Sequence, residues 1–410
     1  MSDPVVAIIG AGQGGFQVAS SLRQEGFAGR VLLFGDEGVL PYQRPPLSKS
    51  YLAGEAGLDA VWLRSEAFYQ KQAIDLAAGE RVAAIDRRGR RLELASGRGI
   101  TFDHLVLATG ARNRPLAVPG AELDGVLGLR SLADADALRR RLDEASAVVV
   151  VGAGFIGLEF AAVALAAGVA VHLVELTQQP MGRVVSAPVS QFFTEAHRRW
   201  GAMISLGTGI ARILGENGRA EGVETNDGRR LAADLVLVCI GVIPNTELAA
   251  AAGLAIDDGI VVDAGLATSE PAISAIGDCA NFPTRFAAAR VRLESVQNAV
   301  DQGRSVAAGI AGKPQPYDKV PWFWSDQRDL KLQIAGLTTG RDQTVLRGDP
   351  ASGSFSVFCF RGGRLIGVES VSRPADHIAA RRILLGAPRL SPDEAADPDY
   401  DLRALARRPQ

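Results

Sequence analysis

Cysteine and histidine are both scarce in this 410-residue chain. The three cysteines, Cys239, Cys279 and Cys359, lie far apart and form no CxxC motif. We therefore expect no disulfide framework, and a reducing, cytoplasmic environment. The four histidines show none of the spacings that are typical of zinc ligands, so no metal site is predicted.

A strong excess of charge of either sign is also lacking, because the formal net charge is only −2. Such a chain has no global field that would attract nucleic acid or an anionic membrane, and we expect neither as a partner. The N-terminal stretch MSDPVV has no basic segment of the kind that opens a secretory signal, so we expect no such signal.

One apolar run, residues 147–174, is long enough to be mistaken for a membrane span. Glu159 interrupts this run, and Gly152, Gly154 and Gly157 gather at its start. A buried strand followed by a buried helix explains the pattern better than a helix in a bilayer.

Glycine and hydrophobic residues, in contrast, are abundant, with 46 glycines and a hydrophobic share of 47%. This composition is typical of a large, close-packed α/β protein. The length of the chain predicts two or three domains.

A dinucleotide-binding fingerprint opens the chain. The apolar run 4–9 predicts a buried parallel strand, residues 16–25 a helix and residues 30–34 a second strand. The glycine-rich turn between the first strand and the helix contains Gly10, Gly12, Gly14 and Gly15. Asp36 follows the second strand at the usual distance of about 20 residues, where an acid accepts hydrogen bonds from a ribose diol. This βαβ unit predicts a nucleotide site, with the pyrophosphate at the N-terminus of the helix.

The same pattern recurs in the middle of the chain, so that two nucleotide-containing molecules are expected in one protein. Residues 148–151 predict the strand, residues 159–167 the helix and residues 169–174 the second strand. The turn contains Gly152, Gly154 and Gly157, and Glu175 is the ribose acid. An acid at this place favours NADH over NADPH, because it repels a 2′-phosphate.

Three further strands are predicted to end in small or acidic residues that a ligand or a crossing chain can approach. Thr109 and Gly110 end the first of them, and Gly241 ends the second. Asp278 follows the third, where an acid points into the crevice at the carboxyl end of a parallel sheet.

The pattern of predicted elements changes after about residue 320. Residues 330–337, 344–348 and 354–370 predict antiparallel strands, with a hairpin turn at Gly362-Gly363, and residues 375–385 predict a helix. These elements predict a third, α+β domain.

The order of motifs along the chain identifies a family. Between and after the two glycine-rich turns come LPYQRPPLSK (40–49), ATG (108–110), GVIPN (241–245), IGDC (276–279) and PWFWSDQ (321–327). This order resembles the FAD- and NADH-dependent ferredoxin reductases of bacterial oxygenase systems. The resemblance covers nearly the whole chain, and RPPLSK together with PWFWSDQ is more specific than either glycine motif.

The resemblance implies two Rossmann-like dinucleotide-binding domains of the glutathione-reductase type, followed by a C-terminal α+β domain. Residues 1–112 and 245–318 would form a discontinuous FAD-binding domain. Residues 113–244 would form the NADH-binding domain, and residues 319–410 the C-terminal domain.

The resemblance also extends the expected cofactor sites. It adds Arg44, Lys49, Val82, Arg130, Asp278, Val296 and Trp324 to the residues of the first turn. The expected FAD set is then Gly10, Gly12, Gly14, Gly15, Asp36, Arg44, Lys49, Val82, Thr109, Gly110, Arg130, Asp278, Val296 and Trp324. The expected NADH set is Gly152, Gly154, Gly157, Glu159, Glu175 and Gly241.

Lys49 and Glu159 are the two expected catalytic residues, as an ion pair at the place where hydride passes from nicotinamide to flavin. Two plainer interpretations stay open: Lys49 as a solvated surface lysine, and Glu159 as an acid stabilised by a helix N-terminus. Trp324 is expected beside the flavin at the exit for electrons, and its alternative is a core aromatic of the third domain.

The residues 36–60, where related disulfide reductases and peroxidases carry cysteine, contain none. Reduced FAD must then pass electrons directly to an acceptor, and the resemblance implies a small acidic [2Fe–2S] ferredoxin that serves an oxygenase. An excess of basic residues between Arg285 and Lys331 suits such a partner, although an ordinary mixed surface explains it as well. A rubredoxin reductase, an NADH oxidase or peroxidase, and a redox sensor like apoptosis-inducing factor remain alternatives.

Overall fold

The computed structural model describes residues 3–386 and 389–407. Its contacts divide the chain into two compact units. The first comprises Met1–Gln43, Asp59–Arg112 and Ile243–Pro321; the second comprises Arg44–Leu58, Asn113–Val242 and Trp322–Gln410. The RPPLSK segment thus packs with the second unit.

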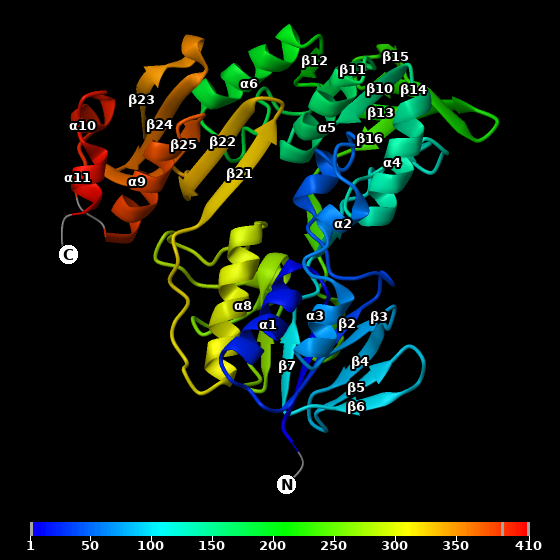
Figure 1. The fold of residues 1–410 in the computed structure, drawn as a ribbon. Helices are drawn as coiled ribbons and strands as arrows, with labels where there is room; N and C mark the ends of the chain where they lie inside the picture. Colours follow the sequence, from blue (N-terminus) through cyan, green and yellow to red (C-terminus); the bar gives the residue numbers. More distant parts are fainter. Residues whose placement is uncertain (1–2, 387–388, 408–410) are drawn as a thin grey trace. The chain divides into compact units, whose positions relative to one another are not determined.

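The first unit is built on a five-stranded parallel sheet with β1 at its centre (Figure 1). Its strands, in spatial order, are β19 (Ile273–Ala275), β7 (His104–Leu107), β1 (Val5–Ile9), β2 (Arg30–Gly35) and β3 (Ile74–Ala78). The strands are apolar and buried: Ile8, Leu33 and Val106, which lie side by side in the register, are inaccessible to solvent. Helices α1 (Gln13–Gln24) and α8 (Val296–Ile310) pack against each other.

Smaller elements complete the first unit. An antiparallel sheet contains β4 (Val82–Asp86), β5 (Arg91–Leu94) and β6 (Gly99–Thr101). The short elements are α3 (Glu66–Lys71), α7 (Glu247–Ala251), β18 (Ile260–Val261), η2 (Gly277–Cys279) and β20 (Ala280–Asn281). Three of the five points at which the chain changes unit lie within α2 (Leu58–Val61), β8 (Ala111–Asn113) and β17 (Val242–Pro244).

The second unit repeats the parallel sheet of the first. Its strands, in spatial order, are β12 (Met203–Leu206), β11 (Ala170–Glu175), β10 (Ala147–Val151), β16 (Leu235–Val238) and β9 (Val126–Leu127). Its helices are α4 (Leu132–Glu144), α5 (Phe155–Ala166) and α6 (Ala187–Arg199), and an antiparallel sheet contains β13 (Ile210–Glu216), β14 (Arg219–Thr225) and β15 (Arg230–Ala232). The strand before the glycine-rich turn is central in both sheets and pairs in parallel with the strand after the helix, which confirms the two predicted βαβ units.

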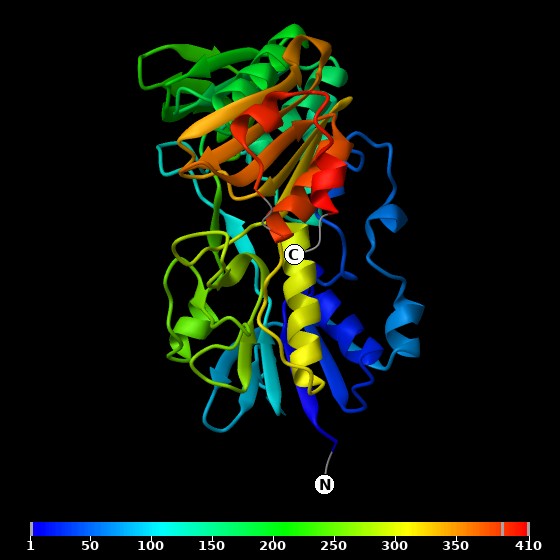
Figure 2. The same cartoon turned by 90° about the vertical axis from the view of Figure 1, so that its left-hand side faces the viewer.

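The predicted antiparallel region at the C-terminal end of the chain is also present, within the second unit. Its strands, in spatial order, are β21 (Trp322–Gln327), β22 (Leu330–Gly336), β25 (Arg364–Val371), β24 (Ser354–Arg361) and β23 (Gln343–Asp349). Around them lie η3 (Pro350–Ser352), α9 (Pro374–Gly386), α10 (Pro392–Ala396) and α11 (Leu402–Ala406) (Figure 2). The turn between β24 and β25 consists of Gly362 and Gly363, both with positive φ, as the hairpin prediction requires.

Both helices after the glycine-rich turns begin earlier than the sequence patterns predict, at Gln13 and Phe155. The reason is that Gly12 and Gly154 already are the N-cap residues, so that the last glycine of each motif lies in the first helical turn. A Cβ on Gly157 would lie 2.2 Å from the carbonyl oxygen of Gly152, so only glycine allows this close packing.

Among the helices of the described residues, none combines the length and the apolarity of a membrane span.

Candidate dinucleotide sites and a buried ion pair

The glycine-rich turn of the second unit presents an uncapped helix N-terminus. Gly152 has a φ of 98°, which favours glycine, and Gly154 is the N-cap of α5 without a side-chain cap. The first N–H groups of a helix have no partner within it, and the helix dipole favours an anion there. A Cβ built on Gly154 would meet no atom within 4 Å, so this cradle has room for the pyrophosphate of a dinucleotide.

The turn of the first unit has the same geometry. Gly10 has a φ of 107°, Gly12 is the uncapped N-cap of α1, and a Cβ on Gly12 would again meet nothing within 4 Å. Asp36 is exposed directly after β2, at the carboxyl edge of the sheet. The residues of both units therefore fit the phosphates and ribose of a dinucleotide.

Glu175 is fixed in place by the glycine-rich turn itself. Its Oε2 accepts a hydrogen bond from the backbone N–H of Ala153 at 2.8 Å. Its Oε1 accepts bonds from the backbone N–H and the hydroxyl of Thr177, both at 2.8 Å. Arg183 is the nearest arginine or lysine after Glu175 in the sequence, but it lies beside Gly241. Its Nη2 is 3.6 Å from the position that a Cβ on Gly241 would occupy. The geometry therefore suits a ribose with a free 2′-hydroxyl.

Replacing Glu175 by alanine should shift coenzyme preference towards NADPH. Loss of the carboxylate removes the repulsion of a 2′-phosphate, and we expect the ratio of NADPH to NADH efficiency to rise about 100-fold. Steady-state reduction of an artificial acceptor with each coenzyme measures this ratio. Glu216→Ala, which removes an exposed carboxylate of β13, is the matched control and should leave the ratio unchanged. An unchanged ratio in Glu175→Ala would contradict the assignment.

The ion pair expected between Lys49 and Glu159 is present in the second unit. Lys49 Nζ lies 2.7 Å from Glu159 Oε2, with side-chain exposures of 20% for the lysine and 3% for the glutamate. Lys49 follows η1 (Pro45–Ser48), whose two prolines stiffen the backbone, and Glu159 lies in α5 after the glycine-rich turn. Glu159 is thus buried and paired with Lys49, and no acid lies in the first turn of α5, where the helix dipole acts most strongly.

Two serines also donate hydrogen bonds to the Glu159 carboxylate, and the sequence analysis predicted neither. Ser48 Oγ donates to Oε2 at 2.5 Å, and Ser325 Oγ donates to Oε1 at 2.6 Å. Ser325 lies in the PWFWSDQ motif, where the structure shows that Trp322 and Trp324 are half-buried but Ser325 and Gln327 are fully buried. Polar residues at alternate positions of a strand that are inaccessible to solvent require partners.

The remaining predicted FAD residues are divided between the two units. Gly10, Gly12, Gly14, Gly15, Asp36, Val82, Thr109, Gly110, Asp278 and Val296 belong to the first unit. Arg44, Lys49, Arg130 and Trp324 belong to the second. Within the first unit, Thr109 Oγ1 donates to the carbonyl of Asn245 at 2.6 Å, Asp278 lies in η2 and Val296 begins α8. Within the second, the Arg44 guanidinium donates to the carbonyl oxygen of Arg130.

Trp324 belongs to an aromatic series on one face of β21. Its ring centroid lies 5.6 Å from that of Trp322, which in turn lies 5.8 Å from the ring of His377 in α9. The Arg381 guanidinium lies over the Trp322 ring at 4.6 Å. The role of Trp324 beside the flavin stays a prediction.

The cysteines are poorly suited to thiolate chemistry. Burial and, to a smaller extent, the nearby negative charge of Glu159 raise the pKa of Cys239 to about 12. Burial likewise raises the pKa of Cys279 and of Cys359, both inaccessible to solvent. All three are free thiols, so the described residues contain no cysteine pair that could relay electrons.

Two family models match the chain. The family model described as "Pyridine nucleotide-disulphide oxidoreductase" matches residues 4–303. The chain belongs to this family. A second model, "Reductase C-terminal", matches residues 322–406. The chain is therefore a flavoprotein oxidoreductase, although it lacks the cysteine pair to which the family's name refers.

Individual relatives are similar over nearly the whole chain. Rhodocoxin reductase of Rhodococcus erythropolis is 51% identical over 403 residues, which are 98% of this chain and 94% of the relative. The solved structure of a ferredoxin reductase for the CYP199A2 system from Rhodopseudomonas palustris has a TM-score of 0.97 and 52% identity, covering 98% of this chain and all of that one. The reductase in a covalent putidaredoxin reductase–putidaredoxin complex has a TM-score of 0.95 and 40% identity, covering 99% and 98%.

The relatives support the predicted cofactors, and one of them is a rubredoxin reductase. The ferredoxin reductases of this family use FAD and NAD(H). Rubredoxin-NAD(+) reductase of Pseudomonas putida is also similar, at 37% identity over 369 residues, 90% of this chain and 96% of that protein.

Proposed function

We propose that this protein is an NADH-dependent ferredoxin reductase, which passes electrons from NADH through FAD to a small acidic [2Fe–2S] ferredoxin that serves a monooxygenase or dioxygenase. The observation that carries the proposal is the combination of two uncapped glycine turns in one chain with the absence of a cysteine pair. Two dinucleotides can bind, and no thiol relay stands between the flavin and an acceptor.

The residues of the two turns and the Lys49–Glu159 pair bind and orient the two dinucleotides. When bound, FAD accepts two electrons as a hydride and releases them one at a time, which links NADH to a one-electron acceptor. The first glycine turn and Asp36 hold its adenosine and phosphates, and the second turn and Glu175 hold those of NADH. Lys49 and Glu159 form the fixed pair of charges that orients the nicotinamide for transfer.

The domain assignment is part of the proposal. Residues 1–112 and 245–318 form the FAD-binding domain, residues 113–244 the NADH-binding domain and residues 319–410 the C-terminal domain. The duplicated parallel sheets and the separate family model for residues 322–406 support this division. The three free cysteines support a cytoplasmic location.

A basic groove on the C-terminal domain suits an acidic partner better than the 285–331 region does. In that region most bases are paired with acids: Arg285 with Asp318, Arg292 with Asp258 and Glu294, Arg304 with Asp301, Lys313 with Glu25, and Lys331 with Asp326.

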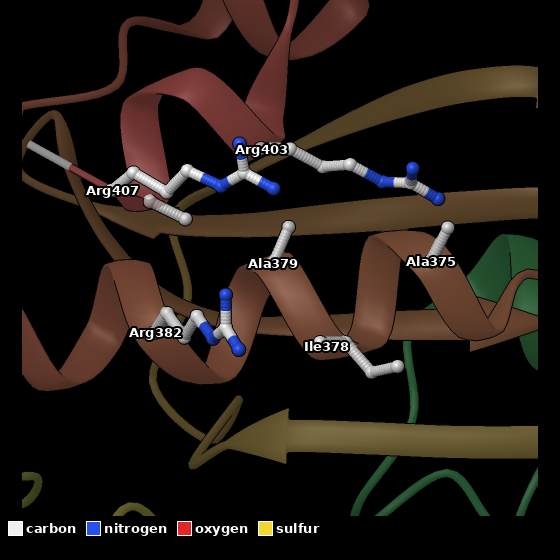
Figure 3. Close-up of a pocket in the computed structure, with 7 residues that line it drawn as sticks. Ala375, Ile378, Ala379, Arg382, Arg403 and Arg407 are labelled. Carbon is white, nitrogen blue, oxygen red and sulfur yellow. The ribbon is translucent and has the colours of Figure 1, made fainter.

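The basic groove is formed by α9 and α11. It is lined by Ala375, Ile378, Ala379, Arg382, Arg403, Ala406 and Arg407 (Figure 3). The Ile378 side chain is 53% exposed, and within the described residues Arg382, Arg403 and Arg407 form no ion pair. An apolar floor with three unpaired guanidinium groups is complementary to an acidic surface.

The test is NADH-driven reduction of cytochrome c by the purified protein, with and without an acidic [2Fe–2S] ferredoxin. We expect a large, saturable and salt-sensitive stimulation by the ferredoxin. Reversing charge in the groove, with Arg382→Glu and Arg403→Glu together, should raise the KM for ferredoxin about tenfold or more without changing flavin bleaching by NADH. Arg364→Glu, at the start of β25, is the control outside the groove.

Other outcomes identify the alternatives. Stimulation by rubredoxin but not by ferredoxins would replace the proposal with a rubredoxin reductase. Rapid NADH turnover with oxygen or peroxide alone would indicate an oxidase or peroxidase. Slow turnover with every acceptor, together with NADH-dependent dimerisation, would indicate a redox sensor.

A further inference from the structure

A chain of buried polar side chains leads away from Glu159 on the side opposite Lys49. Ser325 Oγ donates to Glu159 Oε1 at 2.6 Å, and Gln327 Nε2 donates to Ser325 Oγ at 3.3 Å. Gln327 Oε1 lies 2.8 Å from Nε2 of His197 in α6. The side chains of Ser325, Gln327 and His197 are all inaccessible to solvent.

The charge of Glu159 sets the direction of every hydrogen bond in this chain. An ionised carboxylate only accepts, so the Ser325 hydroxyl must donate to it. The Ser325 oxygen then accepts from the amide NH₂ of Gln327, which leaves the amide oxygen to accept from His197. His197 must therefore carry its proton on Nε2, and its Nδ1 has no partner in the described structure. Burial lowers the pKa of His197 to about 4, so the ring is neutral at neutral pH.

We infer that Ser325, oriented by Gln327 and His197, is a positioning residue that holds the Glu159 carboxylate in one orientation for its ion pair with Lys49. The inference deepens the proposed function and rests on it for the role of the Lys49–Glu159 pair. Oε2 of Glu159 has two donors, Ser48 and Lys49, whereas Ser325 is the donor found on Oε1. Without Ser325, one oxygen of a buried carboxylate loses its partner, which disfavours the charged form.

The chain is suited to orienting a carboxylate and unsuited to conducting a proton. A carboxamide does not readily give up or accept a proton, so Gln327 interrupts any transfer between Ser325 and His197. Strand β21 and helix α6 both pack against α5, so the chain joins the C-terminal domain to the helix that carries Glu159.

The charged and titratable groups around Glu159 are few. Lys49 follows η1, and Cys239, at the end of β16, is the thiol whose proton Glu159 helps to retain. Arg328 lies over the Trp200 ring and within 3.4 Å of the carbonyl of Ala162 in α5. On β11, His172 bonds to Ser205 and Glu175 to Ala153 and Thr177, so neither bonds to Glu159. Lys49 is therefore the cation that pairs with Glu159, and Ser325 is the neutral group that assists it.

The test compares Ser325→Ala and the nearly isosteric Ser325→Cys with the unaltered holoprotein. Bleaching of the bound flavin by NADH, followed in a stopped-flow instrument without ferredoxin, should slow about tenfold or more at acidic pH, below both midpoints, while the Kd for NADH stays unchanged. The pH midpoint of the bleaching rate should move upward by about one to two pH units. Infrared spectra with isotope-labelled glutamate, using Glu159→Gln to assign the band, should show the carboxyl taking up its proton at the same raised pH.

Ser356→Ala is the matched control. Ser356 is also inaccessible to solvent, lies in the same sheet and donates to a buried carboxylate, that of Asp376, at 3.0 Å. It should leave the midpoint and the bleaching rate unchanged. The inference would be overturned if Ser325→Ala had the same infrared and kinetic midpoints as the unaltered protein, or if Ser356→Ala shifted these midpoints equally. If NADH fails to bleach even the unaltered protein, the proposed function is wrong, and the infrared midpoint still tests Ser325.

Discussion

The Gly154→Val variant is expected to purify as a yellow protein that NADH no longer bleaches. Gly154 has φ −76° and ψ −175°, an extended conformation that valine adopts without strain. Its Cβ would meet no protein atom within 4 Å, so the fold should tolerate the change. The added side chain would instead occupy the cradle at the N-terminus of α5, where the phosphates of NADH are expected.

We expect the affinity for NADH to fall by at least about 100-fold, or about 3 kcal/mol. Titration of NADH binding and flavin bleaching measure this loss. Gly57→Val is the matched control, because Gly57 is exposed, has no atom within 4 Å of its Cβ position and is remote in sequence from both turns. Normal bleaching of Gly154→Val would show that NADH does not bind at this turn.

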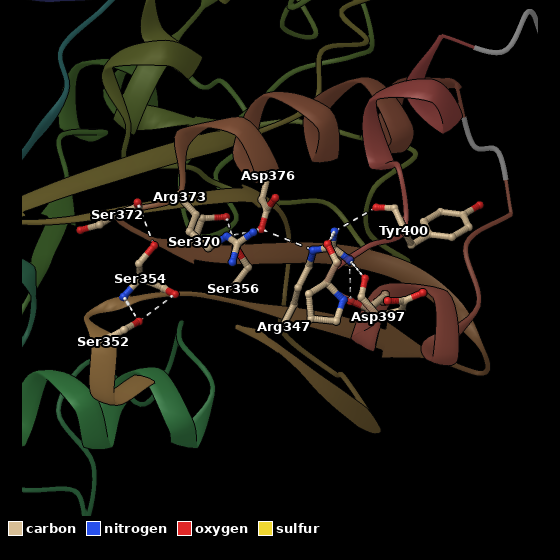
Figure 4. A network of polar contacts seen from close by, with 12 residues as sticks. Arg347, Ser352, Ser354, Ser356, Ser370, Ser372, Arg373, Asp376, Asp397 and Tyr400 are labelled. Carbon is tan, nitrogen blue, oxygen red and sulfur yellow. Dashed lines mark hydrogen bonds and ion pairs between the residues drawn. The ribbon is translucent and has the colours of Figure 1, made fainter. Parts of the chain in front are cut away.

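The Arg347→Met variant should lose about 3–5 kcal/mol of stability, because it removes a buried guanidinium that is the donor to several backbone carbonyl groups. Arg347 of β23 is 4% exposed and lies 3.8 Å from Asp376 (Figure 4). Its guanidinium donates to four carbonyl groups of the C-terminal segment, those of Ala395, Asp397, Pro398 and Tyr400. Methionine keeps the length of the side chain but satisfies none of these acceptors.

Denaturant unfolding measures the loss of stability, and limited proteolysis tests its location. Cleavage should appear first between residues 389 and 407, because the arginine is the polar anchor of that segment. Arg364→Met, an exposed arginine at the start of β25, should change stability by less than about 0.5 kcal/mol. Equal stability of the two variants, with an uncut C-terminal segment, would contradict the proposed anchoring.

Local constraints explain which features the sequence predicts. Only glycine fits at positions 10, 152 and 157, because the backbone there has a positive φ or because a backbone oxygen would lie about 2 Å from a Cβ. Glycine therefore recurs at a fixed spacing that can be recognised in the sequence. The hairpin at Gly362-Gly363 is recognisable for the same reason. The apolar runs before the turns indicate strands that are buried on both faces.

The surroundings of Glu159 have no such local signature. Ser48 is separated from Glu159 by 111 positions and Ser325 by 166, while Gln327 and His197 are 130 positions apart. Serine and glutamine are common in every environment, and only their burial against one another reveals a function. The packing of residues 44–58 with the second unit has the same origin, since Tyr51 donates to Asp136 across 85 positions.

The sequence alone is sufficient to predict the two glycine turns, the acids Asp36 and Glu175 after the second strand of each βαβ unit, the antiparallel C-terminal sheet and the absence of a cysteine pair near the first turn. These features follow from backbone geometry and from residue identities within a few positions of one another. The tertiary structure alone decided that Glu159 is buried, that two serines and Lys49 share its carboxylate, and that Arg347 anchors the end of the chain. A buried charge needs partners from whichever elements the fold brings to it, and the distance along the chain does not restrict their choice.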